Sequence, residues 1–135
     1  MRSGRVKILL IDDDAAVLEV VSLMLASEGH AVLAAGSGRE GLARLESGEA
    51  VDLVLTDLAM PHMTGWDVVR AVKTSWPATP VGLITGTPEH LAEQREVVDA
   101  LIMKPLTLES LRQGIRQVEA SAAARRESRE GGAGP

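Results

Sequence analysis

The sequence predicts a single-domain α/β fold: a doubly wound, five-stranded parallel sheet with five helices covering its two faces. Short apolar runs alternate five times with segments of helical period. The runs are apolar along their whole length, which is typical of strands that are buried on both faces. At 135 residues the chain is also long enough to bury the core of one such domain.

The expected strands are the five apolar runs, each bounded by charged or turn-forming residues. They are Val6 to Ile11, Ala31 to Ala35, Asp52 to Thr56, Val81 to Thr85 and Ala100 to Met103. The first helix lies between the first two runs, where apolar residues recur at helical spacing and Gly29 marks the end. Those residues are Val17, Val21, Met24 and Leu25.

The later helices are predicted from their end signals as well as from their period. Ser37 and Glu40 resemble a capping box that opens the second helix. The third helix is expected over Gly65 to Lys73 and the fourth over Pro88 to Val98. Thr107 caps a fifth helix. One apolar stripe should lay this fifth helix on the sheet, formed by Leu108, Leu111, Ile115 and Val118.

The sequence changes character after Ser121. The last segment, AAARRESREGGAGP, loses its helical period and becomes charged and rich in Gly. We therefore expect a folded domain over residues 1–121 and a disordered tail over residues 122–135.

Composition and charge exclude several classes of function. Cys is absent, so the chain has no disulfide framework and no thiolate metal site. A net charge of −5 argues against direct binding to nucleic acid or to anionic lipid. The N-terminus has too few apolar residues before its three acids for a signal peptide or a membrane span. We expect a cytoplasmic protein without membrane insertion.

Charged and polar residues stand where the predicted strands end. Asp12, Asp13, Asp57, Thr85 and Lys104 all occupy such positions. Because right-handed crossovers place these ends along one edge of a parallel sheet, the side chains should meet there. Carboxylates without His or Cys favour a hard ion, Mg²⁺ or alternatively Mn²⁺.

Such a cluster suits phosphoryl transfer, in which the protein supplies a nucleophile and charge stabilisation. Asp57 is the candidate nucleophile, and an aspartyl phosphate is the expected product. Mg²⁺ and the Lys104 ammonium would neutralise two phosphoryl oxygens, while the Thr85 hydroxyl donates to the third.

Four motifs in order resemble the receiver domain of bacterial response regulators, the CheY-like domain of two-component systems. They are IDDD at residues 11–14, DLAMPHMTG at 57–65, LITG at 83–86 and MKP at 103–105. The resemblance extends from Val6 to Val118 and implies the flavodoxin-like strand order 2-1-3-4-5.

The resemblance also implies a role for each site residue. Asp57 would be the phosphoacceptor and a metal ligand, and Asp12 and Asp13 the acidic pair, with Asp13 the more direct ligand of Mg²⁺. The backbone carbonyl of Ala59 would be a further ligand. Thr85 would move toward the phosphoryl group.

Lys104 would be the counter-ion of the phosphoryl group, followed by a cis bond to Pro105. The donor would be a phosphohistidine on a sensor histidine kinase or on a phosphotransfer protein. Such a domain is not a conventional enzyme, since it catalyses its own aspartyl phosphorylation and dephosphorylation. Its output would be a contact with a downstream protein, and a homodimer formed on phosphorylation is one option.

Two departures from the family pattern affect the read-out. Leu101 stands where the family usually has Tyr or Phe, and the interval from Thr85 to Lys104 is shorter than usual. Both fall on the region of the fourth helix and fifth strand. Our hypothesis is that phosphorylation is retained while the read-out differs from an aromatic switch.

Two alternatives are left open. Asp12 and Asp14 have the D-x-D spacing of haloacid-dehalogenase-type phosphatases, although no cap insertion is present and Asp14 suits a helix cap. A receiver-like interaction module that no longer uses phosphate is the other alternative, and the complete acidic pocket argues against it.

Overall fold

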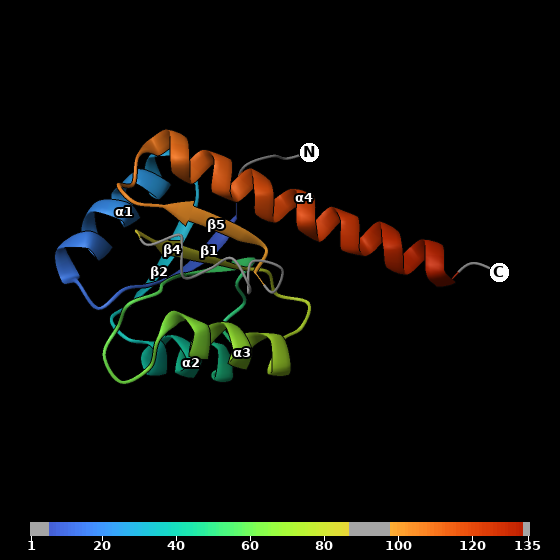
Figure 1. Cartoon of the computed structure of the whole chain (residues 1–135), viewed down its shortest axis with the longest axis horizontal. Helices are drawn as coiled ribbons and strands as arrows, with labels where there is room; N and C mark the ends of the chain where they lie inside the picture. The colour runs from blue at the N-terminus through green and yellow to red at the C-terminus, as the bar shows by residue number, and fades with distance from the viewer. Residues whose placement is uncertain (1–5, 87–97, 134–135) are drawn as a thin grey trace.

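Five parallel strands form one sheet in the order β2-β1-β3-β4-β5, as expected (Figure 1). The computed structural model describes residues 6–86 and 98–133, with side chains as far as residue 121. Every strand begins and ends within one residue of its predicted position. The strands are β1 (Lys7–Ile11), β2 (Ala31–Ala35), β3 (Leu53–Asp57), β4 (Val81–Thr85) and β5 (Ala100–Met103).

Helices cover both faces of the sheet. They are α1 (Ala15–Ser27), α2 (Gly38–Glu46), α3 (Gly65–Ser75) and α4 (Leu108–Ala133). α1 and α4 lie on one face, and α2 and α3 lie on the other (Figure 1). Each face has its own core of aliphatic side chains, because strand residues alternate between the two. Ile8 and Leu10 pack under α1 and α4, whereas Leu9 and Ile11 pack under α2 and α3.

The described part of the chain contains four helices, where the sequence predicts five. The predicted fourth helix, over Pro88 to Val98, falls on residues 87–97 except for its last residue, and residues 87–97 lie outside the described residues.

The last helix is longer than its apolar stripe predicts. α4 continues to Ala133, so the backbone of residues 122–133 is helical where the sequence predicts a disordered tail. Ala, Arg and Glu in this segment are good helix formers even without an apolar stripe. The loss of periodicity therefore marks where α4 leaves the sheet, beyond which it projects from the domain (Figure 1). Leu108 is 36% exposed, so the buried stripe begins at Leu111 rather than at Leu108.

Three of the predicted helix caps are present, and each lies shortly after the end of a strand. Asp14 accepts hydrogen bonds from the N–H groups of Ala16 and Val17. Ser37 Oγ accepts from Glu40 N at 3.0 Å, but the Glu40 carboxylate returns to Gly36 N, so the capping box is shifted by one residue.

Thr107 Oγ1 accepts from Ser110 N at 3.0 Å and caps α4. Since side-chain oxygens satisfy helix-terminal amides, these caps stabilise the starts of α1, α2 and α4.

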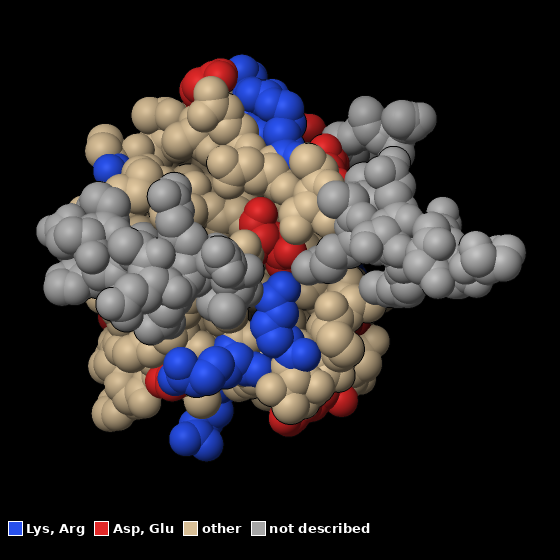
Figure 2. Space-filling view, turned by 45° about the vertical axis from the view of Figure 1, so that its right-hand side comes forward, with Lys and Arg blue, Asp and Glu red and all other residues tan. Residues whose placement is uncertain are grey.

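Surface charges of opposite sign lie next to one another. Arg112 is bonded to Glu28 at 2.8 Å, and Lys7 and Arg44 both approach Glu49. Figure 2 shows acidic and basic side chains adjoining at the centre of one face. Among the described residues, no helix is long and apolar enough to cross a membrane.

Candidate functional site

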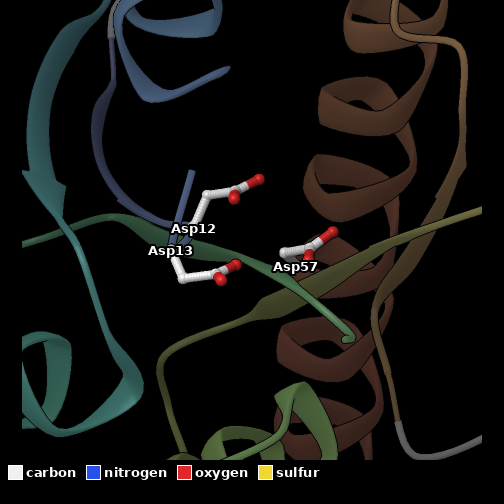
Figure 3. A group of neighbouring side chains, drawn as sticks. All are labelled: Asp12, Asp13 and Asp57. Carbon is white, nitrogen blue, oxygen red and sulfur yellow. The ribbon is translucent and has the colours of Figure 1, made fainter. Parts of the chain in front are cut away.

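Three carboxylates converge at the carboxyl edge of the sheet. Asp12 and Asp13 directly follow β1, and Asp57 is the last residue of the neighbouring strand β3. One oxygen from each lies within 4.8 Å of the others. Figure 3 shows the three side chains leaving the ends of the two strands together. Asp12 and Asp57 are buried and Asp13 is exposed, so the cluster opens to solvent on the side of Asp13.

Lys104 supplies the positive charge of the site. Its Nζ atom lies 2.8 Å from Oδ1 of Asp57. The hydrogen bond to Asp57 raises the pKa of Lys104 above its ordinary value, although partial burial opposes this. The charges of Asp12 and Asp13 act in the same direction as Asp57. Lys104 therefore remains an ammonium group throughout the physiological pH range.

The single positive charge of Lys104 does not balance the negative charges of the three carboxylates. Burial is the main cause that raises the pKa of Asp12, and the charges of Asp57 and Asp13 raise it further. The Asp14 N–H, which donates to Asp12 Oδ1 at 2.9 Å, and Lys104 both oppose the increase. Because like charges at this separation repel, a divalent cation would stabilise the cluster. An all-oxygen donor set of this kind fits Mg²⁺.

Thr85 stands at the same edge, as predicted. It ends β4, it is buried, and its carbonyl accepts a hydrogen bond from Lys104 N at 2.9 Å. The peptide bond between Lys104 and Pro105 is cis, as the resemblance implies. Ala59 is exposed in the loop after β3. The roles of the Thr85 hydroxyl and of the Ala59 carbonyl remain predictions.

Gly65 holds the loop after Asp57 close to the sheet, whereas the sequence pattern marks it only as a helix start. Its N–H donates to the Leu58 carbonyl at 2.8 Å. A Cβ atom at Gly65 would lie 2.5 Å from the Asp57 carbonyl oxygen and 2.8 Å from the Leu58 Cα atom. These atoms are backbone and cannot move aside without displacing Asp57. A Gly directly after a polar turn was the available signal.

Asp14 and His62 stand apart from the acidic cluster. The Asp14 carboxylate is occupied in capping α1, which leaves the D-x-D alternative without its second carboxylate at the site. His62 is exposed on the loop after β3, where its φ is 70°. It lines a hollow of about 380 Å³ that also includes Asp13, Ser37, Arg39 and Met63.

Sequence comparison identifies a matching family and several relatives of this chain. The family model for the response regulator receiver domain matches residues 8–116. The chain is 37% identical over 111 residues to the transcriptional regulatory protein GlrR of Escherichia coli K12, covering 80% of this chain and 25% of GlrR. It is 33% identical to the probable transcriptional regulatory protein SilR of Salmonella typhimurium, covering 82% of this chain and 49% of SilR. The chain thus spans half or less of the length of these relatives.

Solved structures share the fold over nearly their whole length. The chemotaxis response regulator CheY4 of Vibrio cholerae superposes with a TM-score of 0.75 at 32% identity, covering 83% of this chain and 97% of CheY4. A CheY-like receiver domain protein of Methanospirillum hungatei gives 0.77 at 31% identity, covering 90% and 97%. Receiver domains of this kind interact with histidine kinases and with downstream effectors. The chain belongs to the response regulator receiver domain family, the receiver family of two-component systems.

Proposed function

We propose that Asp57 accepts a phosphoryl group from the phosphohistidine of a sensor histidine kinase or of a phosphotransfer protein. The observation that carries the proposal is the Asp57 carboxylate itself, which lies 2.8 Å from Lys104 inside an acidic cluster. Asp12, Asp13, Asp57 and the Ala59 carbonyl would hold Mg²⁺, or Mn²⁺ in its place. Thr85 and Lys104 complete the proposed catalytic set.

In the proposed reaction Asp57 is the nucleophile. An Asp57 carboxylate oxygen forms a bond to phosphorus while the bond from phosphorus to the donor imidazole nitrogen breaks, and the electron pair stays on that nitrogen. In the proposed reaction Lys104 neutralises charge on one phosphoryl oxygen, and the Thr85 hydroxyl donates to another. The metal supplies further charge neutralisation when bound. Water later attacks phosphorus and the bond to the Asp57 oxygen breaks, which regenerates the Asp57 carboxylate and releases inorganic phosphate.

An apolar groove beside Lys104 supports a protein donor. The groove has a volume of about 330 Å³ and is formed by α1 and the segment after β5. Val20, which lines it, is 55% exposed, and Leu23 on the same helix is 65% exposed. Exposed aliphatic side chains next to a reactive group favour a protein contact there. We place the donor protein on this face of α1.

The test of phosphorylation is incubation with acetyl phosphate and Mg²⁺, followed by intact mass measurement and peptide mapping. The expected result is an acid-labile adduct of one phosphoryl group on Asp57. It should be absent from Asp57→Asn and from samples treated with EDTA. A wild-type protein that stays unmodified would instead favour the receiver-like interaction module that does not use phosphate.

The donor face can be tested separately. Val20→Glu should slow phosphotransfer from a phosphorylated donor protein by about tenfold, because it places a charge in an apolar contact. Its rate with acetyl phosphate should equal that of the wild type, since that small molecule needs no protein contact. Equal slowing with both donors would contradict the assignment.

The output is proposed to be a contact with a downstream protein. GlrR and SilR are named as transcriptional regulators, but the present chain covers only part of each. A net charge of −5 and paired surface charges favour an output without direct contact to nucleic acid. Sedimentation with and without phosphorylation would test whether a homodimer is part of that output. The cytoplasm remains the proposed location.

A further inference from the structure

Asp99 directly precedes β5, at the end of the strands opposite to the acidic cluster, and its carboxylate is buried. Its side chain is only 4% exposed. Oδ2 lies 2.8 Å from Lys73 Nζ on α3 and accepts the N–H of Val81 at 2.8 Å. Oδ1 accepts from Ser121 Oγ on α4 at 2.8 Å. One side chain therefore connects α3, β4 and α4 at the point where β5 begins.

The contacts with Val81 fix how β5 pairs with β4. Asp99 N donates to the Val81 carbonyl at 2.8 Å, while Val81 N donates to the Asp99 carboxylate. β5 has four residues and lies at the edge of the sheet, where it pairs with β4. A short edge strand has few ladder bonds to hold its register, and a slip of one residue would turn every side chain to the other face. Asp99 holds the register at the first position.

The register set by Asp99 determines where Lys104 lies. Ala100 stands opposite Gly82, and Met103 stands opposite Thr85. Lys104 follows directly, donates its N–H to the Thr85 carbonyl at 2.9 Å and places Nζ beside Asp57. The four residues of β5 thus separate the anchored end from the residue that contacts the phosphoacceptor.

We propose that Asp99 is a positioning residue for phosphoryl transfer, acting through β5 on Lys104. The proposal rests on the function proposed above for Asp57. Asp99 touches none of the reacting atoms, and its effect on the reaction is the placement of the Lys104 ammonium.

The charge state of Asp99 is compatible with this role. Burial alone would raise its pKa, but hydrogen bonds from Lys73, Val81 and Ser121 outweigh burial and hold the pKa below its ordinary value. Asp99 is therefore ionised at neutral pH and accepts hydrogen bonds from all three partners.

Asp52 offers a matched control with the same local geometry. Asp52 N donates to the Lys7 carbonyl at 2.7 Å, and Lys7 N donates to the Asp52 carboxylate at 2.8 Å. Asp52 precedes β3, which β1 and β4 hold from both sides. The register of β3 is thus secured without Asp52, so Asp52→Ala should leave the phosphorylation rate within about twofold of the wild type.

A double-mutant cycle between Asp99 and Lys104 tests the proposal, with phosphorylation of Asp57 by acetyl phosphate as the measured rate. Asp99→Ala should reduce the rate about tenfold, because small misplacements of a catalytic group have large effects. In a Lys104→Ala background the same substitution should change the rate less than twofold. A full tenfold loss in that background would overturn the proposal, as would a wild-type rate for Asp99→Ala alone.

Two further measurements keep the proposal testable if Asp99→Ala does not fold. Lys73→Met and Ser121→Ala each remove one partner and should each give a smaller loss of rate that disappears in the Lys104→Ala background. The amide resonance of Lys104 should also shift in these variants but not in Asp52→Ala. This spectrum tests the positioning of Lys104 by Asp99 even if the wild-type protein is not phosphorylated. In that case only the function proposed for Asp57 fails. Unchanged Lys104 resonances would overturn the positioning role.

Discussion

Lys104 Nζ and Asp57 Oδ1 lie 2.8 Å apart although their strands are not neighbours in the sheet. β4 runs between β3 and β5 and ends in Thr85. Three consecutive strands therefore deliver a carboxylate, a hydroxyl and an ammonium group to one edge. Because Lys104 is well exposed and Asp57 is buried, the ion pair contributes modestly to stability but provides charge where a phosphoryl group would bind.

Lys104→Ala should reduce the rate of Asp57 phosphorylation by about a hundredfold, because it removes a charge aimed at the transferred group. The measurement is the time course of adduct formation by intact mass, with circular dichroism to verify the fold. Lys73→Ala is the comparison variant, since that ammonium pairs with Asp99 instead. If Lys73→Ala were the slower of the two, Lys104 would not be the catalytic cation.

Mg²⁺ should stabilise the folded protein, because it would bind the cluster of Asp12, Asp13 and Asp57 only in the folded state. At a concentration one hundred times the dissociation constant, the gain in free energy of unfolding is about 2.7 kcal/mol. Urea denaturation followed by Trp fluorescence, in Mg²⁺ and in EDTA, measures it. Asp13→Ala should remove most of the difference. Identical midpoints for the wild type in both buffers would exclude a metal site at this cluster.

Gly65→Ala should destabilise the protein by about 2–4 kcal/mol and also slow phosphorylation. Its Cβ would meet the backbone of Asp57 and Leu58, so relief of the clash must displace the phosphoacceptor. Gly36→Ala is the control, because the nearest atom to its Cβ is a Glu40 side-chain oxygen at 3.6 Å. Denaturant melts and phosphorylation rates of the two variants check this. Equal effects would mean that close packing at residue 65 is unimportant.

The strands were predictable from sequence, because short, continuous apolar runs that alternate with helical segments and end in charged residues are typical of buried parallel strands. The same runs brought Asp12, Asp57 and Lys104 to one edge, as expected. The end of α4 was not predictable from periodicity, because a helix that leaves the sheet needs no apolar stripe. Good helix formers after Ser121 were the available signal, although their interleaved charges are equally typical of a solvated tail.

Asp99 does not stand out in the sequence, for a different reason. A single Asp before a strand is typical of a turn, and its partners Lys73, Val81 and Ser121 are scattered along the sequence. Only the three-dimensional arrangement shows that they converge on one carboxylate. Local patterns predict elements, whereas a contact network of this kind depends on tertiary packing.

Leu101→Ala should lower the free energy of unfolding by roughly 1–2 kcal/mol, because its side chain is partly buried against the core of the α2 and α3 face. The phosphorylation rate should stay within about twofold of the wild type, since Leu101 brings no charged or polar side chain to the site. Methyl NMR spectra of Leu101 in the phosphorylated and unphosphorylated protein test our hypothesis that the read-out differs from an aromatic switch. Spectra that agree there and in the neighbouring segment would show that this region does not switch.

His30 should make stability depend on pH. Its Nδ1 accepts a hydrogen bond from Val6 N at 3.2 Å, so the folded state requires neutral imidazole at that atom. Burial lowers the pKa of His30 below its ordinary value, against the opposing charges of Glu119 and Glu28. A depressed pKa means that the unfolded chain takes up the proton first as the pH falls.

The contribution of His30 to stability should therefore be complete above the ordinary His pKa of about 6.5 and decrease as the pH falls below it toward the folded-state value. Urea denaturation at pH 7.5 and 5.5 measures the change. His30→Gln keeps a hydrogen-bond acceptor without a titrating ring, so it should lose less stability between the two pH values than the wild type does. An equal loss in both proteins would assign the pH dependence to the carboxylates instead.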